Sequence, residues 1–398
     1  MIGLRTITRA ALLALLAQLT TMSHPGAQEV RFETKAQQAF MIDAETGTVL
    51  YSKDPDKLIP PASLAKLMTA ELVFQAVKSG QRSLDDTFAV SEHAWRTGGA
   101  PSRTATMFAA LKSSIPLQDL IQGIVVQSAN DGCIIVAEGM AGSEENFAKR
   151  MNDRARELGL TRSVFKNPTG LPAEGQFTTV RELVMLALHI WKEYPDFYKY
   201  YAQPDFTWNK ITQRNRNPLL AMDIGADGMQ LGFTEGIGYS IVGSAAQNGR
   251  RVFIAMAGLT NDRERAEEAR KLIDWGMKAF ERKVLFAAGE AVGEVSVYGG
   301  VKGQVTLKAN GPIAILIPSD NKDKVIARIV YEGPVLAPIV EGMAVGRLKV
   351  WTGNALTLET PLEAAENIGI GALHQRAFDA ISELLTGWIR TKLTSLKG

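Results

Sequence analysis

Cysteine and histidine are scarce in this chain of 398 residues. The single cysteine, Cys133, excludes an intramolecular disulfide framework and any zinc site that is built on several thiolates. The four histidines, which are His24, His93, His189 and His374, are not spaced as metal-ligand pairs. We therefore expect no resident metal ion and no other cofactor.

Other absences narrow the class of protein further. The sequence has no P-loop, no glycine-rich dinucleotide motif after a strand and no basic run that would suit nucleic acid. Its formal net charge is +2, and its apolar and charged fractions of 46% and 22% are ordinary for a globular protein. At this length the chain can form two domains with sizeable cores.

The apolar run at the N-terminus, residues 10–19, is too short to span a bilayer comfortably. It follows Arg5 and Arg9, and a basic stretch before a short apolar one is typical of a secretory signal peptide. We expect residues 1–27 to be removed after Ala27 and the mature protein to be periplasmic. An uncleaved N-terminal membrane anchor is the alternative.

Strand and helix patterns alternate over residues 28–284. Residues 39–54 and 239–258 each read as a hairpin, the second with an Asn-Gly turn between two apolar runs. The residues between the two hairpins are mostly helical in pattern, apart from a turn-rich loop at 161–180. Strands at both ends of a helical middle predict an α/β (α+β) domain, in which a helical subdomain is inserted into an antiparallel sheet.

The pattern of apolar and polar residues changes near residue 285, after a predicted helix over 262–282. Short alternating segments predict an all-β domain over residues 285–369. Residues 370–398 have an amphipathic helical pattern with Trp388 and basic residues near its end, which suits a helix that lies in a membrane interface. A helix that packs on its own β-rich domain or on a partner is the alternative.

Ser63 and Lys66 are the first candidates for chemistry. On the helix predicted to begin near Ser63, this i, i+3 spacing places both side chains on one face. A buried lysine with a lowered pKa can accept the proton of a serine that acts as a nucleophile. The spacing alone is weak, because Ser319 and Lys322 repeat it in a polar turn of the β-rich domain.

Ser128 and Asn130 form a second polar element inside the apolar stretch VVQSANDGC. Polar groups in such a stretch need partners. Either they begin a capped helix, or Ser128 relays a proton and Asn130 holds a substrate amide.

A third stretch, ADGMQLGFTEGIGYS at 226–240, has a residue pattern that is typical of an active-site strand. It predicts a turn at Asp227–Gly228 and then a short strand. Gly232 lies in the middle of that strand, where a backbone or a ligand can approach closely.

Together these elements resemble the low-molecular-weight penicillin-binding proteins that are D-alanyl-D-alanine carboxypeptidases. The segments FMIDAETGTVLYSKD, PASLAKLMTA, SANDGC and FKNPTGLPAEGQFTT follow one another as in that family. The resemblance implies a penicillin-binding fold, a β-rich C-terminal domain and a terminal helix on the inner-membrane surface. It also implies removal of the terminal D-alanine from peptidoglycan stem peptides through an acyl-serine, with β-lactams as inhibitors.

The resemblance assigns roles to individual residues. Ser63 is the implied nucleophile, Lys66 its general base, and Ser128 the third catalytic residue. The implied substrate-binding residues are Asn130, Arg216, Gln230, Phe233, Thr234 and Arg265. Within this set, the N–H groups of Ser63 and Phe233 would form the oxyanion hole. Arg265, with Arg216 as a second candidate, would recognise the terminal carboxylate.

The third motif of the family, Lys-Thr-Gly on a strand, reads Gln230-Leu231-Gly232 here. A charged hydrogen-bond donor is worth about 1.5–3 kcal/mol and a neutral one about 1. Losing the difference slows a reaction by about ten- to a hundredfold. Our hypothesis is an attenuated serine carboxypeptidase that still acylates. The alternatives are a homologue that binds peptidoglycan peptides without turnover, a β-lactamase and a pure scaffold.

Overall fold

The computed structural model describes residues 32–319 and 323–373. The expected signal peptide and residues 374–398 of the expected terminal helix lie outside these ranges. Within them, no helix is both long enough and apolar enough to cross a membrane.

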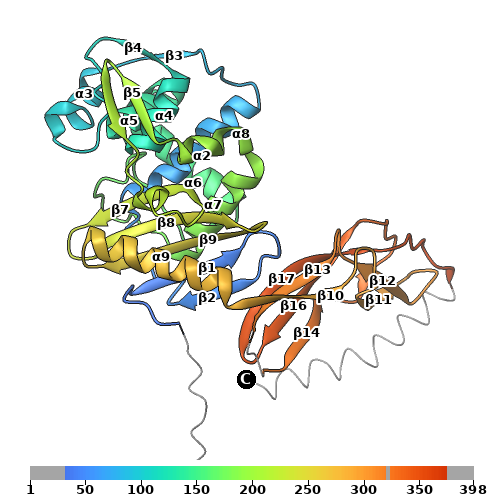
Figure 1. Ribbon diagram of the computed structural model, residues 1–398. Helices are drawn as coiled ribbons and strands as arrows, with labels where there is room; N and C mark the ends of the chain where they lie inside the picture. The colour runs from blue at the N-terminus through green and yellow to red at the C-terminus, as the bar shows by residue number, and fades with distance from the viewer. Residues whose placement is uncertain (1–31, 320–322, 374–398) are drawn as a thin grey trace, which may run out of the picture. The chain divides into compact units, whose positions relative to one another are not determined.

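One antiparallel sheet forms the base of the N-terminal domain. The predicted hairpins are present as β1 (Gln38–Asp43) with β2 (Val49–Lys53), and β8 (Gly238–Gln247) with β9 (Arg250–Leu259). They join with β7 (Ala226–Thr234) in the order β2-β1-β9-β8-β7. The two ends of the domain therefore pair with each other, as the sequence predicts (Figure 1).

The helical subdomain lies between β2 and β7 in the chain. Its elements are η1 (Ala62–Ala65), α2 (Lys66–Lys78), β3 (Thr87–Ala89), α3 (Glu92–Thr97), η2 (Ala100–Ser102), β4 (Ser114–Pro116), α4 (Leu117–Gln127), α5 (Asn130–Ala141), α6 (Glu144–Glu157), α7 (Val180–Glu193), α8 (Pro195–Tyr198), η3 (Lys199–Ala202), β5 (Asp205–Trp208), β6 (Ile211–Arg214) and η4 (Pro218–Ala221). The predicted loop at 161–180 is present between α6 and α7.

Two helices cover opposite faces of the five-stranded sheet. Phe253 of β9 packs against Trp191 of α7, with ring centroids 6.0 Å apart. Met41 of β1 points to the other face, where α9 (Asp262–Lys278) approaches so closely that a Cβ on Gly276 would lie 2.0 Å from the Met41 Cε. Since neighbouring strand residues point to opposite faces, the alternation of side chains along these strands sets both interfaces.

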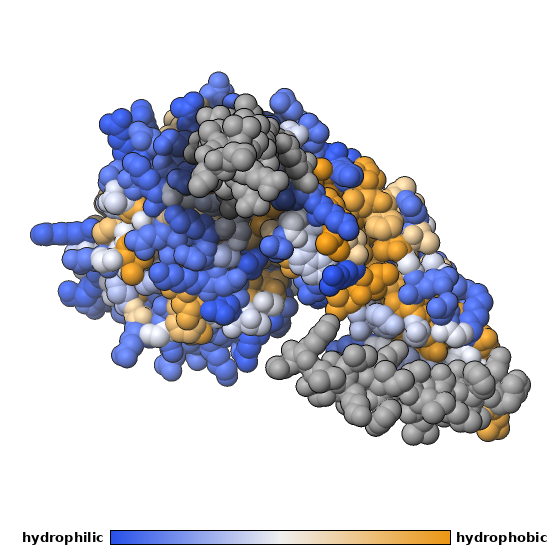
Figure 2. Space-filling model, turned by 90° about the horizontal axis from the view of Figure 1, so that it is seen from below, coloured by the Kyte–Doolittle hydropathy of each residue, from blue (hydrophilic) through white to orange (hydrophobic). Residues whose placement is uncertain are grey.

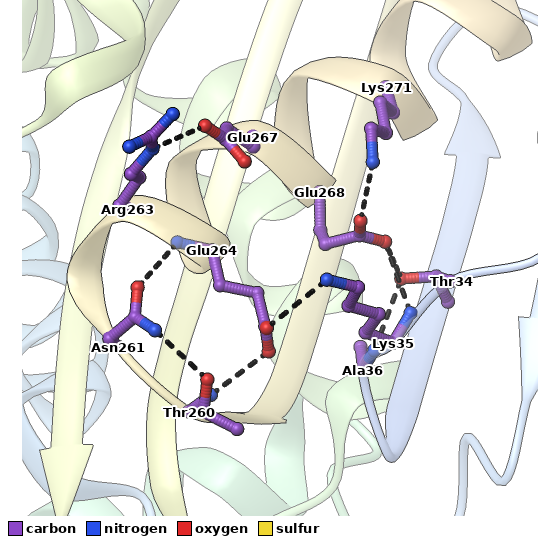
Figure 3. A network of polar contacts seen from close by, with 10 residues as sticks. All are labelled: Thr34, Lys35, Ala36, Thr260, Asn261, Arg263, Glu264, Glu267, Glu268 and Lys271. Atoms are coloured by element: carbon purple, nitrogen blue, oxygen red, sulfur yellow. Dashed lines mark hydrogen bonds and ion pairs between the residues drawn. The ribbon is translucent and has the colours of Figure 1, made fainter.

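Polar contacts fix the first turn of α9 and the chain that precedes β1 (Figure 3). Asn261 caps the helix, because its side chain accepts a hydrogen bond from the Glu264 N–H at 2.8 Å. Glu268 accepts from the Thr34 hydroxyl at 2.8 Å, and Lys35 lies 3.6 Å from Glu264. The start of α9 is therefore tied to the segment that leads into β1.

The C-terminal module is all β, as predicted. Its strands are β10 (Phe280–Phe286), β11 (Gly293–Tyr298), β12 (Gln304–Lys308), β13 (Ile313–Pro318), β14 (Val325–Tyr331), β15 (Val335–Leu336), β16 (Ala344–Thr352) and β17 (Ala355–Ala364). Six form a sheet in the order β14-β16-β17-β12-β11-β15, and β10 pairs with β13. The helix expected over 262–282 ends earlier, at Lys278, because its last expected residues pair as strand β10.

A buried carboxylate organises the loop that leads to β4. Asp131 of α5 is 0% exposed and accepts hydrogen bonds from the N–H groups of Met107 and Ala109, both at 3.0 Å, and from the Thr106 hydroxyl. Replacing it would leave several buried donors without an acceptor.

We expect Asp131→Ala to lower the free energy of unfolding by about 3 kcal/mol, because buried unpaired donors are costly. Denaturant titration measures this loss. The control is Asp196→Ala, whose side chain is 91% exposed, and which should change stability by less than about 0.5 kcal/mol. Equal stabilities of the two variants would contradict the role of Asp131.

Candidate active site

Ser63 and Lys66 meet where η1 passes into α2. The Lys66 Nζ donates hydrogen bonds to the Ser63 Oγ at 2.9 Å and to the Thr169 carbonyl at 2.7 Å. Lys66 is 1% exposed, and within the described residues its amine contacts no carboxylate. The two predicted residues therefore form a hydrogen-bonded pair that is closed off from water on the lysine side.

Burial changes the acid–base behaviour of this lysine. Desolvation lowers the pKa of Lys66 to about 8, and the nearby charge of Arg216 acts in the same direction. An ordinary lysine has a pKa of about 10.4. A much larger fraction of Lys66 is therefore neutral at mildly alkaline pH, and a neutral amine can accept the proton of the Ser63 hydroxyl across the same contact.

The turn-rich loop at 161–180 packs against the Ser63–Lys66 pair. Gly170 has φ +77°, and a Cβ there would lie 1.7 Å from the Ala62 carbonyl oxygen. Only glycine allows this approach. It brings the carbonyl of Thr169, the preceding residue, against Lys66. Sequence reasoning identified the loop but not this contact, because an isolated Thr-Gly pair is common.

The junction of α4 and α5 forms a second wall. Ser128 ends α4 in the left-handed region with φ +56°, and Asn130 begins α5. The alternative interpretation of a side-chain cap is wrong, since the N-cap residue is Ala129. The Asn130 amide donates to the Thr104 hydroxyl at 2.9 Å, while its buried Oδ1 has no partner within the described structure. A ligand N–H can satisfy that oxygen.

Strand β7 forms the third wall. Gly232 allows it to approach η1, because a Cβ there would lie 3.2 Å from the Leu64 Cγ and 3.3 Å from the Ala62 Cβ. Gln230 is 4% exposed, and its Oε1 accepts a hydrogen bond from the Leu231 N–H at 3.2 Å. The predicted close approach at Gly232 is confirmed. At position 230 the strand carries an amide side chain in place of the lysine of the family's third motif.

The turn predicted at Asp227–Gly228 is wrong. Both residues lie inside β7, which has a register shift against β8 between Ala226 and Gly228. Pairing with β8 overrides the local turn preference of an Asp-Gly pair. The Asp227 carboxylate is held by an ion pair with Arg251, at 2.6 Å, and by the Tyr198 hydroxyl at 2.9 Å.

Aromatic and guanidinium groups lie at the mouth of the site. The Phe233 side chain is 55% exposed, and its ring lies 4.6 Å from that of Tyr239. Arg265 of α9 is buried beside the Tyr239 ring, pairs with Asp262 and donates to the Gly232 carbonyl at 3.4 Å. Desolvation lowers the pKa of Arg265, but a guanidinium remains charged.

These walls enclose a cavity of about 640 Å³. The predicted site residues that line it are Ser63, Ser128, Asn130, Arg216, Gln230, Phe233 and Arg265. Lys66 reaches it through Ser63, whereas Thr234 does not line it. The sequence did not point to the other lining residues, Thr104, Ala105, Leu171, Pro218, Tyr239 and Asp262. Only Asp262 left a local signal, an acid three residues before Arg265 on one helix.

Comparison with known proteins decides the family. Residues 21–260 match the family of D-alanyl-D-alanine carboxypeptidases, and residues 280–369 match the C-terminal domain of penicillin-binding protein 5. The chain belongs to the D-alanyl-D-alanine carboxypeptidase family. It is 34% identical to the D-alanyl-D-alanine carboxypeptidase DacC of Escherichia coli, over 87% of this chain and 88% of that one. It is 31% identical to DacA of Haemophilus influenzae, over 94% and 97% of the two chains.

Solved structures of family members have the same fold. Penicillin-binding protein 5 from Haemophilus influenzae superposes with a TM-score of 0.73 at 32% identity, covering 85% of this chain and 99% of that one. Penicillin-binding protein D2 from Listeria monocytogenes, in an ampicillin-bound form, gives a TM-score of 0.54 at 28% identity, over 62% and 99%. The predicted penicillin-binding fold with a C-terminal all-β domain is therefore confirmed.

We expect acylation of Ser63 by an uncharged p-nitrophenyl ester to become faster as pH rises and to level off above a midpoint near the Lys66 pKa of about 8. Below that pKa Lys66 is protonated and cannot accept the serine proton, so the rate falls with pH. Lys66→Met should remove the dependence together with most of the rate. A wild-type rate that stays constant between about pH 6 and 10 would contradict the role of Lys66.

Gly170→Ala should slow the same acylation by about tenfold or more, because the new Cβ displaces Ala62 and the adjacent Ser63 from their positions. Gly142→Ala is the matched control: Gly142 also has positive φ, +78°, but a Cβ there meets nothing within 4 Å. The two glycines have nearly the same φ, so a difference in acylation rate reports mainly the contact with Ala62. Equal rates would show that this contact does not position Ser63.

Proposed function

We propose that this protein removes the terminal D-alanine from peptidoglycan stem peptides by way of an acyl-enzyme on Ser63. One observation carries the proposal: the Lys66 Nζ lies 2.9 Å from the Ser63 Oγ, while burial lowers the pKa of that lysine. Membership of the D-alanyl-D-alanine carboxypeptidase family supports the reaction type and the substrate class.

The proposed reaction has two steps. The Ser63 Oγ attacks the carbonyl carbon of the scissile peptide bond while Lys66 accepts the hydroxyl proton. The C–N bond then breaks, and the leaving D-alanine amine takes up a proton, which Lys66 or Ser128 delivers. Water hydrolyses the ester in the second step and regenerates the Ser63 hydroxyl. The N–H groups of Ser63 and Phe233 remain our proposal for the oxyanion donors.

Substrate is proposed to lie along β7. The unpartnered Oδ1 of Asn130 would accept a peptide N–H, and Arg265 would receive the terminal carboxylate, assisted by Arg216. Thr234 does not line the cavity, so we no longer include it in direct substrate contact.

Gln230 and Leu231 are proposed to attenuate the reaction and not to abolish it. In the described part of the chain, neither residue forms a hydrogen bond with Ser63 or Lys66. Where the family has Lys and Thr, this chain has Gln and Leu, so a charged donor and a hydroxyl are absent. We expect this to slow acylation by about ten- to a hundredfold. A catalytically silent peptidoglycan-binding protein is the second candidate, because the same substitution favours it.

We propose β-lactams as covalent inhibitors and the periplasmic face of the inner membrane as the site of action. Ampicillin-bound and cefotaxime-bound structures exist for a relative, penicillin-binding protein D2. Exposed apolar side chains gather in the C-terminal module, where orange surface is visible in Figure 2. They include Val340 at 62%, Ile370 at 60% and Leu373 at 84%, close to where the described chain ends. These side chains are consistent with attachment of residues 370–398 to a membrane surface.

The test of function is the intact mass of residues 28–398 after incubation with benzylpenicillin. We expect a covalent adduct that Ser63→Ala does not form. The double variant Gln230→Lys with Leu231→Thr should acylate about ten- to a hundredfold faster, because it restores the charged donor and the hydroxyl.

Different results separate the alternatives. No adduct at high concentration and long times would favour peptide binding without catalysis. Rapid turnover of penicillin, faster than peptide cleavage, would favour a β-lactamase.

A further inference from the structure

The edge strand β7 carries an apolar surface at the mouth of the cavity. Side chains two residues apart on a strand point to the same face, so Leu231 and Phe233 share one face of β7. Tyr239 of β8 pairs with Phe233, and their ring centroids lie 4.6 Å apart. All three residues line the same cavity as Ser63. We call the side chains of Leu231, Phe233 and Tyr239 the apolar ledge.

The apolar ledge is open to a ligand and is not part of the hydrophobic core. The Phe233 side chain is 55% exposed, and Leu231 and Tyr239 are half-buried. Where the family's third motif has a threonine, Leu231 offers no hydroxyl and extends the apolar surface instead. A ligand group that covers these side chains removes apolar area from water, which is favourable. The ledge therefore favours an apolar group and not a polar one.

Arg265 determines which part of a substrate reaches the apolar ledge. Its guanidinium lies 5.4 Å from the centre of the Tyr239 ring and donates to the Gly232 carbonyl at 3.4 Å, directly before Phe233 in the chain. In the function proposed above, Arg265 receives the terminal carboxylate of the peptide. The carboxylate and the side chain of an amino acid are attached to the same carbon. A carboxylate bound at Arg265 therefore brings the side chain of the terminal residue to the ledge.

We propose that the apolar ledge selects the residue that leaves, and that the preferred stem peptides end in a D-residue with a larger apolar side chain than alanine. The proposal rests on the function proposed above and narrows its substrate class. A methyl group covers little of an exposed phenyl ring, whereas a branched alkyl group covers more. The chemical step is the same: the Ser63 Oγ–C bond forms, the C–N bond breaks, and the terminal residue leaves with the proton that Lys66 or Ser128 delivers.

Selection of the leaving residue has its own kinetic signature. Peptides that end in D-alanine and in D-leucine give the same acyl-enzyme, because the terminal residue has already left. The ledge therefore changes kcat/KM, which covers the steps up to acylation, and does not change the rate of ester hydrolysis. Removing one methylene from water is worth about fourfold, so partial cover of a leucine side chain predicts a kcat/KM about fivefold or more above that for alanine.

The experiment compares diacetyl-lysyl-D-alanyl-D-alanine with the same peptide ending in D-leucine. Mass spectrometry of the released residue gives kcat/KM for each peptide, and the measured quantity is the ratio of D-leucine to D-alanine release. We expect a ratio of about five or more for wild type and of about one for Phe233→Ala. This variant keeps the backbone N–H of residue 233, and a general loss of activity or of folded protein cancels in the ratio.

Ile237→Ala is the matched control. Ile237 lies in the turn of the same hairpin, is 40% exposed and does not line the cavity. Its variant should keep the wild-type ratio. Leu231→Thr should lower the ratio, because it replaces part of the apolar ledge with a hydroxyl that favours the carboxylate of either peptide equally.

Two results would overturn the proposal. One is faster release of D-alanine than of D-leucine by wild type, and the other is an unchanged ratio in Phe233→Ala. Failure of wild type to release either residue would instead show that the proposed function is wrong. Calorimetric binding of both peptides to Ser63→Ala then tests the ledge alone. Tighter binding of the D-leucine peptide, lost when Phe233→Ala is added, supports the ledge, and equal affinities overturn it.

Discussion

The structure depends on a lysine that is buried without a carboxylate partner in the described chain. Lys66 is nearly inaccessible and is held by two neutral oxygens, those of Ser63 and Thr169. Burying an ammonium group without an opposite charge is costly, so the site favours the neutral amine. Because the neutral amine is favoured, Lys66 can act as a base for Ser63. The surrounding elements keep Lys66 buried.

Close backbone approaches maintain this environment. Gly170 lets the loop before α7 lie against the Ala62 carbonyl of η1, so that the Thr169 carbonyl accepts a hydrogen bond from Lys66. Gly232 lets β7 lie against the same η1 segment. The helical subdomain adds Asn130, whose amide is fixed by Thr104. The site is thus assembled from a loop, a helix junction and a strand that are far apart in the sequence, and each contributes backbone as much as side chain.

Local patterns predicted a large part of this arrangement. An Asn-Gly turn and alternating apolar residues predicted β8 and β9, and i, i+3 spacing predicted that Ser63 and Lys66 share a face. Long-range contacts could not be predicted in this way. Asp227 and Gly228 pair with β8 as part of β7 and do not form the predicted turn. No sequence pattern near Thr104 predicts its hydrogen bond to Asn130. The family's third motif aligned with β7, and the resemblance implied Arg216 and Arg265 as site residues, but only the structure shows that both line one cavity with Ser63.

The central claim is that Ser63 and Lys66 carry out turnover without a cation on β7. Release of D-alanine from a pentapeptide that ends in D-alanyl-D-alanine tests this most directly. The account predicts many equivalents of D-alanine released per enzyme by wild type, slowly, and none by Ser63→Ala or Lys66→Met. Release of at most one equivalent would contradict turnover, and release that persists in Ser63→Ala would contradict the assignment of the nucleophile.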